Sequence, residues 1–157
     1  MDGEEPTDGV RIRTLARQDV ARLVRMDEQE TGRNRKAWYE GKLKLVLDES
    51  DMKISLGAEV DGILVGAVLG SLQYGEVGVP EPVAVLDTIL VDRGFRGRGI
   101  ATAILDALVK NLGALGIDRL RTEVAWNDRD LLGFLGRSGF APAARLVLER
   151  SLKGNGA

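Results

Sequence analysis

The feature that most constrains this chain is an unbroken succession of strand, glycine-rich segment and helix between residues 83 and 115. Residues 83–91 are almost entirely apolar, which is typical of a central strand buried on both faces. Three glycines lie among the next eight residues, and residues 99–115 then place aliphatic side chains at helical spacing on one face, up to Gly116. This succession predicts an α/β fold with a ligand site at the start of the helix.

The rest of the chain is expected to place further strands and helices around this unit. The alternation of apolar and polar residues predicts strands at 10–15, 54–60, 63–72 and 120–126, and a last strand region at 139–140 and 144–152. Helical spacing predicts helices at 18–26, at 34–47 after a cap at Asn34, and from a cap at Asn127 or Asp128 to 138. Asp61 and Gly62 predict a hairpin turn, and 74–82 is expected to be a loop. The class is α/β with a mixed sheet.

Length and composition limit the possible functions. A chain of 157 residues is expected to form one domain over 10–152, with flexible ends at 1–9 and 153–157. It has no cysteine and no histidine, which excludes thiol nucleophiles, Ser-His-Asp triads and Cys or His zinc sites, and we expect no metal. The 22 basic residues nearly balance 24 acidic ones, so no nucleic-acid partner is expected. No apolar run is long enough to span a bilayer, so we expect no membrane association and a cytoplasmic location.

The glycine-rich segment has the chemistry of a pyrophosphate site. Glycines let the main chain approach a ligand, and the first amides of a helix have no internal acceptor, so they can donate to phosphate oxygens. Arg96 and Arg98 add charged donors. The spacing fits neither a dinucleotide fingerprint nor a P-loop. The remaining alternative is a helix start with glycines for turning and arginines for solubility.

Two blocks of the sequence resemble the GNAT superfamily of acyl-CoA-dependent N-acetyltransferases. Arg96-x-x-Gly99-x-Ala101, after a strand and before an aliphatic helix, resembles the coenzyme A signature of that family. Residues 123–127, a helix, and then Ser-Gly-Phe-Ala-Pro at 138–142 resemble its later strand, helix and Gly-Phe element. The resemblance implies a mixed, mostly antiparallel central sheet, flanked by helices, with a splay between its fourth and fifth strands.

The resemblance also implies a co-substrate, acetyl-CoA, and the residues that bind it. The pantetheine arm would pair with the main chain of the fourth strand at Ile89, Leu90 and Val91. The pyrophosphate would lie against a run of seven residues, which are Arg96, Gly97, Arg98, Gly99, Ile100, Ala101 and Thr102. Asn127 would either contact the pantetheine or cap the following helix.

The reaction that the resemblance implies is direct attack of a primary amine on the thioester in a ternary complex. Two carboxylates are candidates for the general base: Asp87, which could instead be an ion-paired or substrate-orienting carboxylate, and Glu123, which could instead face Arg121 or solvent. Many members of the family carry a tyrosine acid where this chain has Leu135. Water or Tyr74 would then protonate the leaving thiolate.

The acceptor side is the least defined part of the sequence. Trp38 and Tyr74 are the candidate substrate contacts. Trp38 and Tyr39 could line the acceptor groove, although an aromatic at helical spacing is more often part of the core. We expect a peptide or protein amine, or a small-molecule amine, as acceptor. The alternatives are an acyl-CoA-binding sensor or structural module without turnover, and a nucleotide-binding protein that is not a transferase. A homodimer is common in the family.

Overall fold

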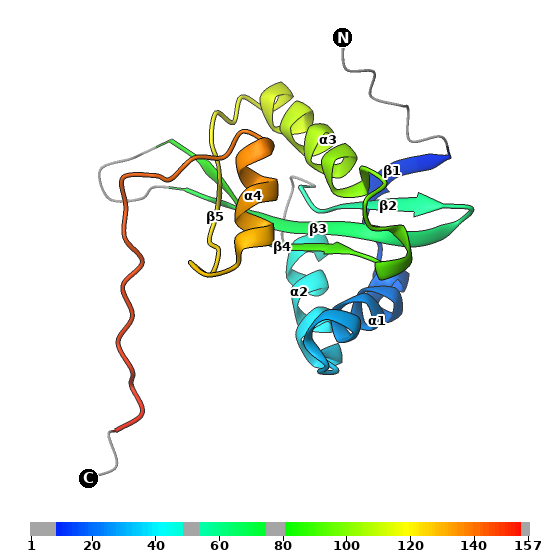
Figure 1. Ribbon diagram of the computed structural model, residues 1–157, viewed down its shortest axis with the longest axis horizontal. Coiled ribbons are helices and arrows are strands. Elements are labelled where there is room, and N and C mark those ends of the chain that lie inside the picture. Colours follow the sequence, from blue (N-terminus) through cyan, green and yellow to red (C-terminus); the bar gives the residue numbers. More distant parts are fainter. Residues whose placement is uncertain (1–8, 49–53, 75–80, 155–157) are drawn as a thin grey trace. The chain divides into compact units, whose positions relative to one another are not determined.

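A computed structural model describes residues 9–48, 54–74 and 81–154 of the chain, so the N-terminal tail and most of the expected loop at 74–82 lie outside the described residues. Its centre is a five-stranded sheet in chain order (Figure 1). The strands are β1 (Val10–Thr14), β2 (Leu56–Val60), β3 (Ile63–Gln73), β4 (Val83–Val91) and β5 (Leu120–Thr122). The first four run antiparallel and β4 pairs with β5 in parallel. The predicted mixed, mostly antiparallel sheet is therefore confirmed.

The helices occupy two compact units of the chain, residues 1–123 and 124–157. They are α1 (Val20–Thr31), α2 (Lys36–Asp48), α3 (Ile100–Ala114) and α4 (Arg129–Arg137), with short 3-10 turns at Arg17–Asp19 and Arg93–Phe95. In the first unit, α1 and α2 cover one face of the sheet and α3 covers the other (Figure 1). No helix within the described ranges is both long and apolar enough to cross a membrane.

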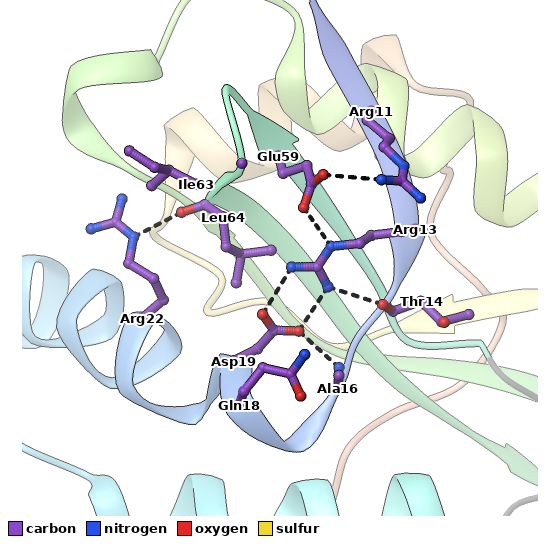
Figure 2. A pocket seen from close by; sticks show the side chains of 11 residues that line it. Arg11, Arg13, Thr14, Ala16, Gln18, Asp19, Arg22, Glu59, Ile63 and Leu64 are labelled. Carbon is purple, nitrogen blue, oxygen red and sulfur yellow. Dashed lines mark hydrogen bonds and ion pairs between the residues drawn. The ribbon is translucent and has the colours of Figure 1, made fainter.

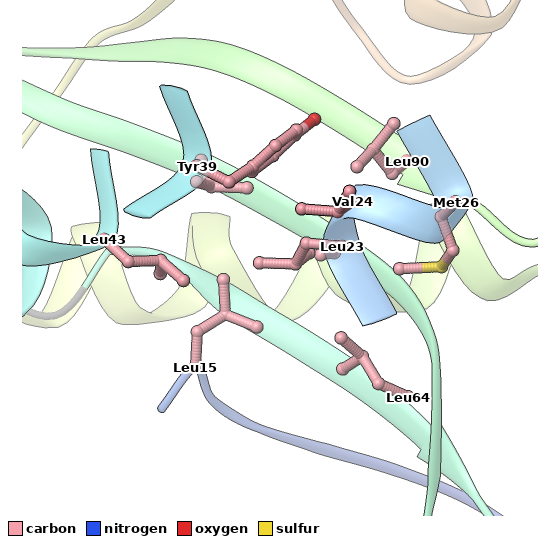
Figure 3. Packing of buried hydrophobic residues seen from close by; sticks show 10 residues of the cluster. Leu15, Leu23, Val24, Met26, Tyr39, Leu43, Leu64 and Leu90 are labelled. Carbon is pink, nitrogen blue, oxygen red and sulfur yellow. The ribbon is translucent and has the colours of Figure 1, made fainter. Parts of the chain in front are cut away.

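The core of the first unit forms where α1 and α2 meet the sheet (Figure 3). Leu23 and Met26 of α1 and Tyr39 of α2 are fully buried. They pack with apolar residues of β3 and β4, among them Leu64 and Leu90. Burying one such side chain stabilises the fold by about 1.5–3 kcal/mol. This packing fixes α1 and α2 against the strand that carries the candidate site.

The β2–β3 turn and the β3–β4 ladder depart from regular strand geometry. Asp61 has φ 51° and Gly62 φ 77°, as the predicted tight turn requires. Between β3 and β4, Thr88 pairs with Leu69 but Leu86 pairs with Gly70. One residue of β4, Asp87, is therefore left without a partner on β3 and forms a β-bulge.

The second unit contains α4 and the C-terminal segment. The Asp128 carboxylate accepts a hydrogen bond from the Leu131 amide at 3.1 Å, so Asp128 is the N-cap of α4 and the alternative of a cap at Asn127 is wrong. Gly139 (φ 94°) ends the helix, and the Phe140 amide donates to the Leu135 carbonyl at 3.0 Å.

One predicted strand is shorter than expected, and another does not form within the described residues. The strand expected over 120–126 ends at Thr122, and within the described residues 139–154 contain no strand. Leu146 and Leu148 are 88% and 86% exposed. Alternating apolar residues satisfy one face of a sheet, but a strand also needs a neighbouring backbone for its hydrogen bonds, and a sequence pattern does not supply one.

Candidate functional site

A fork between β4 and β5 defines the candidate site. The two strands pair only at Ala84 with Leu120, Val85 with Arg121 and Leu86 with Thr122. The Thr122 hydroxyl donates to the Leu86 carbonyl at 2.9 Å and so closes the last pair. Beyond Leu86, β4 has no strand partner on this side among the described residues. Its main-chain groups there can pair with an extended ligand, which is the splay that the resemblance implied.

Both candidate carboxylates lie at the start of this fork. Asp87 directly follows Leu86, and Glu123 directly follows Thr122, so each comes immediately after the last paired residue of its strand. Paired strands lie about 4.8 Å apart, so the two residues start from neighbouring backbone positions. Glu123 is exposed, and the Asp87 side chain is 29% exposed. Asp87 is also the bulged residue of β4, and bulges commonly change the direction of a side chain.

The predicted coenzyme A strand leads from the fork to the glycine-rich loop. Ile89, Leu90 and Val91 pair with β3 on one side through Val68, Ala67 and Gly66. On the other side they continue β4 beyond its last pair with β5.

The glycine-rich loop has the geometry of an anion site. The Asp92 carboxylate accepts a hydrogen bond from the Gly94 amide at 2.9 Å and shapes the turn that leaves β4. Gly97 and Gly99 both have φ 74°, a left-handed conformation that favours glycine. Residues 96–99 are exposed, and α3 begins at Ile100, so the amides of Ile100 to Thr102 have no acceptor within the helix. Exposed loop and free amides together fit a pyrophosphate.

The loop arginines already have partners in the protein. Arg96 is ion-paired with Glu30 of α1, and Arg93 lies 3.5 Å from the same carboxylate. Arg93 also donates to the Gln29 carbonyl. The Arg98 guanidinium lies over the Phe95 ring at 5.1 Å. A pyrophosphate on Arg96 would therefore compete with Glu30. No local sequence pattern predicts this contact, because Glu30 and Arg96 are 66 residues apart.

A second contact from α1 holds the start of the loop. Arg22 donates to the Asp92 carboxylate at 2.8 Å and to the Leu64 carbonyl at 2.8 Å. The Asp92 amide donates to the Val65 carbonyl at 2.8 Å. One guanidinium thus joins α1, β3 and the beginning of the loop.

Asp87 is ion-paired with Lys42 of α2. An ion pair is one of the alternatives that the sequence left open for Asp87, but its partner, 45 residues away in the sequence, was not predicted. Trp38 lies four residues before Lys42, so the two side chains share a face of α2. Trp38 is 40% exposed. Trp38 lies one helical turn from Lys42, the partner of Asp87, and so remains a candidate contact for the acceptor.

Next to Trp38, a buried cluster joins α1 to the start of α2. Asp27 is a buried residue, 1% exposed. Its carboxylate accepts two hydrogen bonds from Arg35 at 2.8 and 2.5 Å, and these hold the pKa of Asp27 below its usual range. Arg35 also lies 4.8 Å over the Trp38 ring. Tyr39 is fully buried and belongs to the core, as is usual for an aromatic residue at helical spacing. Burial and the nearby Asp27 charge raise the pKa of the Tyr39 hydroxyl, which has no hydrogen-bond partner among the described residues.

The remaining predicted residues lie apart from the fork or in the second unit. Tyr74 directly follows β3 and is 65% exposed. It lies four to five residues along the β3–β4 ladder from Asp87, so the two backbones are roughly 15 Å apart. The structure therefore does not bring the Tyr74 and Asp87 backbones together. Leu135, in place of the usual tyrosine, is a buried residue of α4, and Asn127 lies in an exposed turn.

A separate cavity of about 590 Å³ lies beside β1, the β2–β3 hairpin and the start of α1 (Figure 2). None of the predicted site residues lines it. Arg13 crosses it and donates to Asp19 at 2.8 and 2.9 Å and to Glu59 at 2.7 Å. Burial disfavours the charged form of Asp19, but the hydrogen bonds from Arg13 and from the Ala16 amide outweigh it and lower its pKa. The network is satisfied internally, so we assign it a structural role.

A scan against protein-family models finds the acetyltransferase (GNAT) family over residues 18–140, which includes the fork, the loop and α3. The match covers most of the chain. The chain therefore belongs to the GNAT family of acetyltransferases.

Solved structures show the same fold. An aminoglycoside N-acetyltransferase, AAC(6')-Iy, in complex with CoA is 19% identical over 91% of this chain and 95% of its own, with a TM-score of 0.77. A ribosomal-protein-alanine N-acetyltransferase from Brucella melitensis biovar Abortus 2308 is 23% identical over 90% and 99%, with a TM-score of 0.71. An aminoglycoside acetyltransferase from an uncultured soil metagenomic sample, in complex with sisomicin, is 16% identical over 95% and 100%, with a TM-score of 0.72.

Proposed function

We propose that this protein is an acetyl-CoA-dependent N-acetyltransferase that acts on a primary amine. The observation that carries the proposal is the fork, because the free side of β4 leads directly into the exposed glycine-rich loop. A strand edge for an extended arm and an anion site for a pyrophosphate thus follow one another along the chain. Acetyl-CoA would supply an activated acyl thioester there.

The residues of the fork would bind and orient the two substrates. Ile89, Leu90 and Val91 would offer main-chain groups to the pantetheine, and the amides of α3 with Arg96 and Arg98 would bind phosphate oxygens. Because these are mostly main-chain roles, they depend on backbone position more than on side-chain identity.

Asp87 or Glu123 would take the proton that the amine must lose, directly or through water. Both lie where the fork opens, and Asp87 already holds an ammonium group, that of Lys42. That contact favours Asp87, since a carboxylate that binds one ammonium can bind the ammonium of an acceptor.

The acceptor would be a small-molecule amine or the amine of a peptide or protein. Both kinds are supported by the structural neighbours, which are described as aminoglycoside and as ribosomal-protein-alanine acetyltransferases. Trp38, beside Lys42 on α2, would be the first acceptor contact to test.

Charge reversal in the loop is expected to weaken cofactor binding. Arg98→Glu replaces a charged donor by an acceptor, and a hydrogen bond to a charged group is worth about 1.5–3 kcal/mol. We expect the Kd for acetyl-CoA, measured by titration calorimetry, to rise about tenfold to a hundredfold. Arg25→Glu makes the same change on the exposed surface of α1 and should leave the Kd within about twofold. Equal affinities for both variants would remove the loop from the site.

Asp87→Asn and Glu123→Gln separate the two candidate bases. A general base contributes about a hundredfold or more to the rate, and it works only when ionised. We expect Asp87→Asn to lower kcat/KM by about a hundredfold and to abolish the rise with pH that belongs to the base. Glu123→Gln should keep the wild-type profile. The reverse result would make Glu123 the base, and two wild-type profiles would remove both.

The proposal as a whole is tested by titration calorimetry with acetyl-CoA, followed by free-thiol detection with polyamines, aminoglycosides and short peptides. Binding with amine-dependent thiol release supports the enzyme and begins to define its acceptor. Binding without release across the panel supports the alternative, an acyl-CoA sensor or structural module. The presence of Leu135 in place of the tyrosine acid also favours that alternative. No binding would overturn both.

A further inference from the structure

One amine of the protein itself lies at the candidate site. Lys42 extends from α2 to Asp87, and their side chains are only 20% and 29% exposed. The other lysines of the described residues, Lys36, Lys44, Lys110 and Lys153, are all exposed, and Lys36 pairs with Glu40 on its own helix. Lys42 therefore differs from them both in its surroundings and in its partner.

The position of Asp87 brings this amine to the place where acyl transfer would occur. Asp87 is the bulged residue at the opening of the fork, and the proposed pantetheine strand begins two residues later at Ile89. A bound thioester would lie at the end of the pantetheine arm, next to the residue that would accept the proton from an amine. In the structure the amine at that residue is Lys42.

We infer that Lys42 is a self-acetylation site, an inference that rests on the proposed function. Asp87 takes a proton from the Lys42 ammonium, and the free amine attacks the carbonyl carbon of the thioester. The new bond joins Nζ to the acetyl carbon, and the C–S bond breaks. The sulfur leaves with the bonding electrons as a thiolate, and the second proton lost from nitrogen goes to the thiolate through water. The products are acetyl-Lys42 and free CoA.

The modification would change the acceptor side of the site. Acetylation removes the charge of Lys42 and with it the ion pair, which leaves the Asp87 carboxylate without this partner. An acceptor amine then no longer has to displace the Lys42 ammonium. Acetylated protein should therefore differ from unmodified protein in its KM for an acceptor amine.

The test incubates the full chain with acetyl-CoA and no acceptor, and then maps acetylated peptides by mass spectrometry. We expect one acetyl group at Lys42 before any at Lys44, which is exposed on the same helix. The rate per chain should not change on dilution of the protein, because the reaction is intramolecular. Lys42→Arg should abolish the modification and the accompanying thiol release, whereas Lys44→Arg should leave both unchanged.

Asp87→Asn distinguishes a directed reaction from random chemical acetylation. The variant should slow acetylation of Lys42 and leave the slow background at Lys44 as it is. Equal rates at Lys42 in the variant and the wild type would overturn the inference. It would also be overturned, with the proposed function intact, if external amines were acetylated while Lys42 stayed unmodified. If acetyl-CoA did not bind at all, the proposed function would fail first.

Discussion

Replacing Arg35 by methionine is expected to destabilise the protein by about 3 kcal/mol. The change leaves the carboxylate of Asp27, a residue only 1% exposed, without the two hydrogen bonds that neutralise it. Breaking a buried pair costs about 3–5 kcal/mol, and the lower end applies because the Arg35 side chain is itself 38% exposed and partly screened by water. The contact of Arg35 with the Trp38 ring is lost as well. Urea unfolding of wild type and variant at neutral pH measures the difference.

The pH dependence gives a second signature of the same pair. In the wild type, Arg35 holds the pKa of Asp27 below its unfolded value, so the stabilisation is present above the unfolded pKa and is lost as pH falls through the folded pKa. In Arg35→Met, burial without a partner raises the pKa of Asp27 instead. The difference in the free energy of unfolding between Arg35→Met and the wild type should therefore become smaller at acid pH. Arg33→Met removes an exposed arginine two residues earlier and should cost less than about 0.5 kcal/mol. Equal losses in both variants would contradict the role of the pair.

Replacing Gly66 by valine is expected to disturb both the fold and the proposed cofactor site. A Cβ atom at Gly66 would lie 2.7 Å from Cγ2 of Ile100, the first residue of α3, and 3.3 Å from the Leu90 carbonyl. Overpacking of this kind costs about 1–3 kcal/mol. Relief of the clash moves the start of α3, whose amides form the proposed phosphate site. We expect the Kd for acetyl-CoA to rise about tenfold or more, since hydrogen bonds to charged groups are worth about 1.5–3 kcal/mol each.

The matched control makes the same substitution where there is room. Gly113 lies in α3, a Cβ atom added there would meet no atom within 4 Å, and valine is a better helix former than glycine. Gly113→Val should keep both the stability and the affinity. If Gly66→Val kept them too, the contact of β3 with Ile100 would not position the loop.

Much of the fold follows from local patterns that do not depend on distant contacts. The apolar run of β4, the aliphatic stripe of α3 and the Asp61–Gly62 turn each have a local physical cause, and each was predicted. The C-terminal strand was predicted by the same kind of pattern and is wrong. The apolar residues of this segment are exposed in the structure. A strand needs a neighbouring strand to receive its backbone hydrogen bonds, and alternation of apolar and polar residues does not provide one.

The sequence by itself determined the family, through the spacing of Arg96, Gly99 and Ala101, and with it the region proposed to bind the cofactor. Backbone geometry accounts for the glycine at position 99, since glycine is favoured where φ is positive. Only the tertiary structure decided which charges meet. The pairs of Lys42 with Asp87 and Glu30 with Arg96 join residues 45 and 66 positions apart. Such contacts arise from the packing of α1 and α2 on the sheet, and a pairing over that separation has no local signature that a sequence pattern could carry.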